Sequence, residues 1–229
     1  MSGIGTLSER TLHRAVKEYL EPDVRCQEVP VAGIVADLFR DGEVIEVQTG
    51  SVTPLVKKLL GLPPMPVTIV LPIIREKRIC TVDENGVLLR CRKSPKRGTV
   101  YDCYYQLPRL LPLLGREKLT LRLLLLDADE YRTEAPNARV GRRDCRRLDR
   151  VPTAFREDHS YRFPEGLGGL LPPELPEVFT REMLRQATGL SPRAVSGGLA
   201  ALQKCGAVER CGREGRACLY RRVVSGDGR

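Results

Sequence analysis

The chain has 229 residues, a formal net charge of +9 and a pI near 9.3. This length allows two domains, each with its own core, and the excess of Lys and Arg favours a polyanionic partner. The longest apolar stretch, residues 119–126, is too short to cross a bilayer, and the first residues do not resemble a signal peptide. We therefore expect a cytoplasmic protein without membrane contact. The eight cysteines form no C-x₂-C pair, which argues against a structural zinc site and favours reduced thiols.

A predicted hairpin near the N-terminus brings two carboxylates together. Residues 34–40 and 43–48 have the composition of two strands, and the Asp-Gly pair between them favours a two-residue turn. This turn places Asp37 opposite Glu46, with Gln48 two residues further on the same face. Like charges directly opposite destabilise a sheet unless a cation lies between them, and such oxygen ligands suit Mg²⁺ or Mn²⁺. The alternatives are a solvated sheet face or a register shifted by one residue.

The segments around this hairpin place further polar residues beside it. Residues 8–20 have helical periodicity, and Glu9 and His13 lie on or beside the apolar stripe. A Thr-Pro pair begins a short helix over residues 53–60. Residues 67–71 form an apolar run typical of a buried parallel strand. Counting one strand before the hairpin, the predicted order is helix, three strands, helix, strand.

This order and these acids resemble the core of the PD-(D/E)xK nuclease superfamily over residues 7–72. In the resemblance, Asp37 matches the first acid and Glu46 begins the (D/E)-x-K element, whose last position is Gln48. Glu9 matches the acid that many members carry on the first helix. The resemblance implies a restriction-endonuclease-like αβββαβ core and Mg²⁺- or Mn²⁺-dependent cleavage of phosphodiester bonds, with Asp37 and Glu46 as metal ligands.

The sequence departs from the family at the lysine, which is Gln48 here. Some restriction endonucleases of this superfamily use Glu-x-Gln and still cleave. A glutamine would hold the attacking water only by hydrogen bonds, while the metal lowers the pKa of that water. Lys57 or Lys58 could replace the lysine, although we favour a solvated or phosphate-facing position for both. For His13 we favour packing or capping over a role in the site. The whole chain is also similar to uncharacterised bacterial proteins that share its Glu-x-Gln-Thr segment.

The C-terminal part resembles a winged helix-turn-helix domain. Residues 179–187 are predicted to form a short helix, followed by a Thr-Gly-Leu turn and a second helix that Ser191 caps. Residues 207–210 and 216–222 follow as two strands joined by a basic loop. Capped helices, a glycine turn and a basic hairpin together are typical of this DNA-binding domain.

In this resemblance the second of the two helices is the recognition helix. Its outward positions are Arg193, Ser196, Gly197, Ala200, Gln203 and Lys204. Arg193 can reach a base edge or a phosphate, and Arg213 and Arg216 in the wing can reach the backbone. The alternative is a winged helix that contacts only protein.

Residues 73–135 are predicted to extend the first domain with a hairpin, a helix over residues 100–111 and a strand over residues 119–128. Tyr101, Tyr104 and Tyr105 near the start of this helix could stack on bases, but we favour core positions with an exposed hydroxyl for these tyrosines. Residues 136–170 are rich in Arg, Gly and Pro and are predicted to be a linker. Basic residues gather at two places, which are Arg90, Arg92, Lys93, Lys96 and Arg97, and then Arg139, Arg142, Arg143, Arg146, Arg147 and Arg150.

The sequence thus predicts an α/β fold with a nuclease-like domain (residues 1–135), a linker (136–170) and a winged-helix domain (171–225). The first hypothesis is a metal-dependent DNA endonuclease that the winged helix directs to DNA. The alternative is a DNA-binding regulator whose nuclease-like domain is inactive, and a third reading is a non-enzymatic adaptor. DNA or RNA as substrate, and a homodimer as assembly, are left open.

Overall fold

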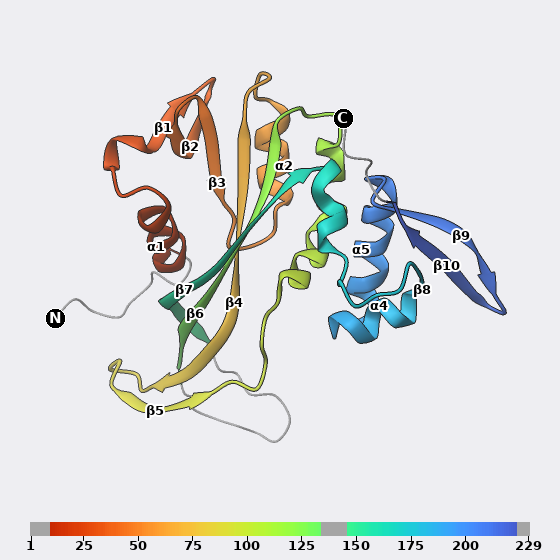
Figure 1. The fold of residues 1–229 in the computed structure, drawn as a ribbon. Coiled ribbons are helices and arrows are strands. Elements are labelled where there is room, and N and C mark those ends of the chain that lie inside the picture. The colour runs from red at the N-terminus through yellow and green to blue at the C-terminus, as the bar shows by residue number, and fades with distance from the viewer. Residues whose placement is uncertain (1–9, 134–145, 224–229) are drawn as a thin grey trace.

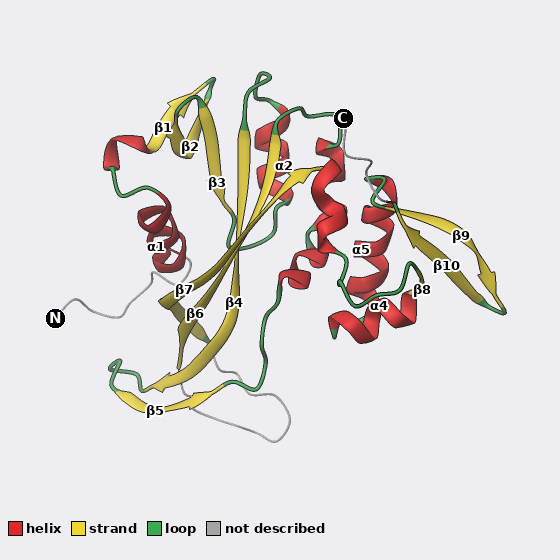
Figure 2. Ribbon diagram, in the orientation of Figure 1, coloured by secondary structure: helices red, strands yellow, loops and turns green. Residues whose placement is uncertain are grey.

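The computed structural model describes residues 10–133 and 146–223 and contains one large sheet with helices on both faces (Figure 1). The sheet has seven strands in the order β1-β2-β3-β4-β6-β7, and β5 pairs with β4 outside this path. A second sheet of three strands, in the order β8-β10-β9, forms in the C-terminal part, and helices lie between it and the large sheet (Figure 2). The expected α/β fold is confirmed at this level.

Both helices and strands form along the whole described part of the chain. They are α1 (Arg10–Leu20), η1 (Val24–Cys26), β1 (Gln27–Val31), β2 (Ile34–Arg40), β3 (Glu43–Val47), α2 (Thr53–Leu60), β4 (Val67–Val82), β5 (Leu88–Lys93), η2 (Val100–Tyr105), α3 (Leu107–Leu110), η3 (Leu111–Leu113), β6 (Leu119–Thr133), β7 (Arg147–Phe163), η4 (Glu165–Leu170), β8 (Val178–Thr180), α4 (Arg181–Thr188), α5 (Pro192–Lys204), β9 (Val208–Glu214) and β10 (Ala217–Arg222). No helix in the described ranges has the length and apolar character needed to cross a membrane.

The β2–β3 hairpin has the expected register. Leu38 pairs with Ile45, and the two turn residues, Asp41 and Gly42, have φ values of 51° and 79°. These positive values are those that a two-residue Asp-Gly turn requires. A register shifted by one residue is therefore excluded. On its other side β3 runs parallel to β4, as the apolar run predicted.

The central strands are much longer than expected. β4 has 16 residues and β6 has 15, and the two run parallel over this length. β7 has 17 residues and pairs antiparallel with β6, so the linker interpretation is wrong for residues 147–163. This strand was not recognised in the sequence because many of its residues are charged. These charged residues pair across the sheet, as Asp158 of β7 does with Arg122 of β6 at 2.6 Å. Residues 134–145, which include Arg139, Arg142 and Arg143, lie outside the described part.

Helices cover the two faces of the large sheet (Figure 1). Leu12 and Val16 of α1 are buried on one face with Leu38, Ile45 and other apolar side chains of the sheet. The opposite face is covered by α2, by the η2–α3–η3 segment and, beyond it, by α4 and α5. The catalytic candidates on β2 and β3 therefore lie between α1 and α2.

The C-terminal helices begin and end as the sequence predicted. The side chain of Thr180 accepts a hydrogen bond from the Met183 N–H at 3.2 Å, and Ser191 accepts one from the Ala194 N–H at 3.3 Å. Gly189 closes α4 with a φ of 66°. The strand β8, which pairs with β10, was not expected.

The C-terminal segment does not have a core separate from that of the large sheet. Tyr104 of η2 is fully buried, and its hydroxyl donates to the Leu170 carbonyl at 2.8 Å. Gly198 of α5 packs directly on this ring, since a Cβ built on Gly198 would lie 2.3 Å from the ring carbon Cδ2. One continuous apolar cluster consequently extends from Val44 of β3 to Val208 of β9.

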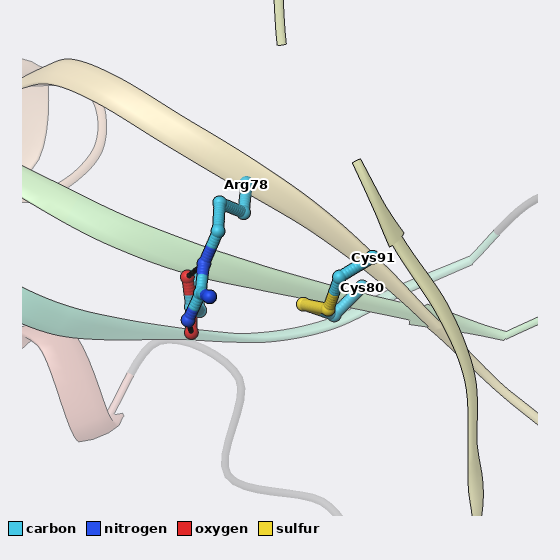
Figure 3. The surroundings of a disulfide bond; sticks show 4 residues. Arg78, Cys80 and Cys91 are labelled. Atoms are coloured by element: carbon cyan, nitrogen blue, oxygen red, sulfur yellow. Dashed lines mark hydrogen bonds and ion pairs between the residues drawn. A yellow bond between two sulfur atoms is a disulfide. The ribbon is translucent and has the colours of Figure 1, made fainter. Parts of the chain in front are cut away.

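A disulfide joins Cys80 of β4 to Cys91 of β5 (Figure 3). The two residues are direct cross-strand partners, with Cα atoms 4.2 Å apart. The expectation of reduced thiols is therefore wrong for this pair. The hairpin predicted within residues 73–135 already placed the two cysteines on adjacent strands, but the irregularity between Thr81 and Val82 that makes them direct partners had no signal in the sequence.

The close contact between Gly198 and Tyr104 yields a test of the junction. Gly198→Ala should destabilise the protein by about 1–3 kcal/mol, because the ring is buried and cannot move away freely. Gly197→Ala is the matched control: its Cβ would meet only Pro108 Cγ at 3.2 Å, and alanine gains helix propensity of about 1 kcal/mol. Urea unfolding of both variants measures the difference. Equal midpoints would contradict the packing of α5 on η2.

Candidate active site

Asp37 and Glu46 meet where β2 and β3 separate. The ladder between the strands ends at the pair formed by Leu38 and Ile45. Beyond this pair, Asp37 Oδ2 accepts a hydrogen bond from the Val47 N–H at 2.8 Å, and Glu46 Oε1 accepts one from the Asp37 N–H at 3.4 Å. The two side chains therefore lie at the same level, as predicted, but each bonds to the backbone of the opposite strand.

The alternation of hydrogen bonds along β3 explains this arrangement. The N–H groups of Val44 and Gln48 donate to carbonyls on the β4 side, those of Pro66 and Val70. N–H groups alternate in direction along a strand, and Val47 lies one residue before Gln48 and three after Val44. The Val47 N–H therefore points to the opposite edge of β3, toward β2. Because β2 has separated there, a side-chain carboxylate takes this N–H in place of a backbone carbonyl.

Lys58 of α2 binds Glu46. Its ammonium donates to Oε1 and Oε2 of Glu46 at 2.7 and 2.8 Å, and to the Val35 carbonyl at 2.5 Å. The interpretation of Lys58 as a solvated residue is wrong, whereas Lys57 is exposed as expected. Leu59 belongs to the buried face of α2. Lys58, the residue before it, lies at the edge of this face, so its side chain can extend to Glu46 on β3.

His13 of α1 binds Asp37 from the other side. Its Nε2 lies 3.1 Å from Asp37 Oδ2. The preference for a packing or capping role is therefore wrong, because this side chain binds the carboxylate of Asp37. Glu9, the acid expected one turn earlier, lies outside the described residues.

Burial and charge act in opposite directions on the two carboxyl groups. Burial disfavours the charged form of Asp37, but the hydrogen bond and charge of His13, with the Val47 N–H and Lys58, hold its pKa below the usual value. For Glu46, burial is the larger effect and raises the pKa, and the charge of Asp37 adds to it, although Lys58 opposes the shift. Asp37 is thus the more readily ionised of the two.

These side chains line a cleft of about 800 Å³. The lining residues are Thr11, His13, Arg14, Lys17, Glu28, Asp37, Glu46, Val47, Gln48, Thr49, Pro54, Leu55 and Lys58. Gln48 thus shares one cleft with both acids, as the strand alternation predicted. In residues 10–133 and 146–223, no three His, Cys, Asp or Glu side chains gather as a metal site. Three carboxylates line the cleft, and Glu28 is already paired with Lys17, so Asp37 and Glu46 are the stronger candidate ligands.

The candidate DNA-contacting residues lie on the surface of the C-terminal segment. Arg193 and Lys204 of α5 are exposed, and Arg213 and Arg216 are exposed at the tip of the β9–β10 hairpin. Ser196 and Gln203 are half-buried, and Ser196 accepts a hydrogen bond from Arg181 of α4 at 3.3 Å. The exposed cations thus lie on two separate elements, Arg193 and Lys204 on a helix and the other two arginines on a hairpin.

Sequence reasoning did not select Lys58 because its contact depends on the packing angle of α2. A usable signal was nevertheless present. The motif places a lysine two residues after Glu46, and the chain has glutamine there and two lysines on the helix that follows. A helix that connects two neighbouring parallel strands packs on the sheet, so one of its cationic side chains can return to the first strand.

Comparison with known proteins identifies the family of this chain. No solved structure matches it. An uncharacterized protein of Treponema pallidum (strain Nichols) is 32% identical over 229 residues, which cover 99% of this chain and 90% of that protein. Residues 10–162 match the family described as Domain of unknown function (DUF8091). This range contains both acids, Gln48, Lys58 and His13, and the chain belongs to that family.

Proposed function

We propose that this protein is a metal-dependent nucleic-acid phosphodiesterase, similar to a DNA endonuclease. The observation that carries the proposal is the contact of Lys58 with Glu46, beside Asp37. Two carboxylates and a lysine are the side chains of the PD-(D/E)xK motif. Here the lysine comes from α2, and Gln48 stands at the position that the motif gives to lysine.

The residues present fit a Mg²⁺ or Mn²⁺ ion. Both ions prefer carboxylate oxygens, and Mg²⁺ commonly binds to one or two carboxylates, with waters and substrate phosphates as its other ligands. Within the described residues, both hydrogen bonds of Asp37 use Oδ2, so Oδ1 can take a further ligand. Asp37 and Glu46 would hold the ion, which supplies charge stabilisation on the phosphate and lowers the pKa of a bound water.

The protein side chains then have separate tasks. The ammonium of Lys58 would bind a phosphate oxygen or the attacking water, since it is a compact cation with three N–H donors. The amide of Gln48 would hold that water by hydrogen bonds, because glutamine cannot accept its proton. His13 would orient Asp37 through the bond to Oδ2. Glu9 remains a candidate for a supporting ligand, as the motif suggests.

A second candidate function is a DNA-binding regulator with an inactive nuclease-like domain. The observation that favours it is that Lys58 already binds both oxygens of Glu46 and so neutralises the carboxylate without a metal. In this case Lys58 would have a structural role only, and Gln48 would mark the position where the catalytic lysine was lost.

In either case, we propose that residues 171–223 act as a winged helix-turn-helix domain that binds DNA. The support is the order α4, turn, α5 and hairpin, with one exposed arginine on α5 and two at the tip of the hairpin. Arg193 near the start of α5 would reach a base edge or phosphate, while Arg213 and Arg216 would contact the backbone.

The metal-ligand assignment predicts a loss of cleavage without a loss of binding. Asp37→Asn and Glu46→Gln should each abolish Mg²⁺-dependent nicking of plasmid DNA, because a neutral amide cannot replace a carboxylate on the ion. The affinity for DNA in EDTA should stay unchanged. Wild-type protein that binds DNA but never cuts it with Mg²⁺ or Mn²⁺ would favour the regulator.

The role of Lys58 predicts an effect on both rate and pH dependence. Lys58→Met should slow cleavage by about 10²–10⁴-fold if the ammonium acts on the water or the phosphate. Lys58 lowers the pKa of Glu46, so its removal raises this pKa further and moves the acid limb of the pH–rate profile to higher pH. Lys57→Met, at the exposed neighbouring position, is the control and should match wild type. An unchanged rate in Lys58→Met would restrict the lysine to a structural role.

The winged-helix proposal predicts a specific loss of DNA affinity. Arg193→Ala together with Arg213→Ala should weaken binding to duplex DNA and reduce the slope of log K against log salt by about 2, since two phosphate contacts are removed. Arg109→Ala removes an exposed arginine outside this segment and serves as the control. Equal affinity of the double variant and the control would exclude the winged helix as the DNA-contacting element.

A further inference from the structure

A second cavity adjoins the carboxylate cleft at Gln48 and Thr49, which line both. It has a volume of about 270 Å³, and its lining includes Gly50 after β3 and residues 71–74 and 77 of β4. Its charged lining consists of Lys77, Lys96, Arg150 and Asp102. Three cations against one carboxylate give this cavity an excess of positive charge.

The wall that carries Lys96 is fixed to the sheet. The Ser94 N–H donates to the Lys77 carbonyl at 2.9 Å, and the Gly98 N–H donates to the Arg75 carbonyl at 2.9 Å. A Cβ on Gly98 would lie 2.4 Å from the Ile74 carbonyl oxygen, so only glycine allows this close approach. Lys96 is exposed, and the structure records no ion pair for its side chain with any other described residue.

Lys77 and Arg150 are held in place by a shared carboxylate. Glu130 of β6 is 1% exposed and binds Lys77 at 2.8 Å and Arg150 at 3.0 Å, and it also pairs with Arg132. Burial opposes the ionisation of Glu130, but the hydrogen bonds from these three cations outweigh it and lower its pKa to about 2. A single buried negative charge therefore orients three cations, and two of them, Lys77 and Arg150, line the cavity.

The remaining acid of the cavity is already engaged. The carboxylate of Asp102 accepts a hydrogen bond from the Thr99 N–H at 3.2 Å and belongs to a capping box at the start of η2. Tyr105 also lines the cavity and is 42% exposed, so the expected core position is wrong for this tyrosine. Its hydroxyl lies 3.3 Å from Ser191 Oγ at the start of α5. The cavity thus connects the carboxylate cleft to the C-terminal helices.

The spacing along β3 fits a nucleic-acid strand. Gln48 lies two residues after Glu46, which corresponds to about 7 Å along a strand. Phosphates of one strand of duplex DNA rise by about 3.4 Å along the helix axis, and those of an extended single strand lie farther apart. The entrance of the cavity is therefore no more than about two nucleotides from the carboxylates. An exposed tyrosine next to a basic groove is a surface on which an unpaired base can stack.

We propose that this cavity binds a backbone phosphate of a single-stranded nucleic acid, through Lys77, Lys96 and Arg150, with a neighbouring base on Tyr105. The proposal deepens the proposed function and rests on it, since the same strand would present its next phosphates to Asp37 and Glu46. A segment of single strand would then pass from the carboxylate cleft, over Gln48, to the start of α5.

The test is the binding of a fluorescent single-stranded 12-nucleotide DNA, and of the RNA of the same sequence, to the full chain in EDTA. Lys96→Glu should raise Kd on the order of tenfold and reduce the salt slope by about 1, because one phosphate contact is lost. Tyr105→Leu should weaken binding without changing the salt slope. Lys118→Glu makes the same charge change just before β6, away from the cavity, and should leave Kd near the wild-type value.

Binding in EDTA separates this proposal from the nuclease activity. If wild type never cuts DNA but Lys96→Glu still weakens binding, the activity is excluded and the phosphate site stands. If wild type cuts DNA and Lys96→Glu binds like Lys118→Glu, the phosphate site is overturned. Repeating the measurement in the Arg193→Ala/Arg213→Ala background excludes an indirect effect through α5, because the same loss of slope is then expected.

Discussion

The buried carboxylate of Glu46 is the feature to which the rest of the site is adapted. Its side chain is 5% exposed and lies beside a second acid, Asp37. A buried charge without a partner costs several kcal/mol, and a like charge nearby adds to this. The ammonium of Lys58 offsets part of that cost by binding both oxygens. Since Lys58 comes from the helix that connects β3 to β4, the packing of α2 and the state of the acids depend on each other.

The same strands that form the site also hold the basic region next to it. The N-terminal part of β4 pairs with β3, which carries Glu46. The C-terminal half of β4 carries Lys77. β6, which runs parallel to β4 over its whole length, supplies Glu130 to orient that lysine. Because one pair of long strands spans both regions, their relative position is fixed by backbone hydrogen bonds rather than by loops. A nucleic acid that bridges them would meet a preorganised surface.

The parts of the structure that could be predicted are those that local chemistry determines. The Asp-Gly turn specifies the register of β2 and β3, and hence the meeting of Asp37 and Glu46. Residues 147–163 could not be recognised, because their charged side chains pair only with strands distant in the sequence. Lys58 and His13 likewise reach the acids from helices whose packing angles no short pattern encodes. Local signals therefore located the acids but not the side chains that control their charge.

The two candidate functions require different partners for Lys58. In a regulator, the lysine would stay on Glu46 as a permanent counter-ion. In a nuclease, Glu46 must turn its oxygens to a metal while the lysine remains in the cleft. The contacts allow this second arrangement, because Lys58 also donates to the Val35 carbonyl at 2.5 Å. This bond belongs to the backbone of β2 and does not involve Glu46, so the ammonium keeps one fixed partner when the carboxylate is withdrawn. Its other N–H groups would then be free to bind the phosphate whose charge they offset.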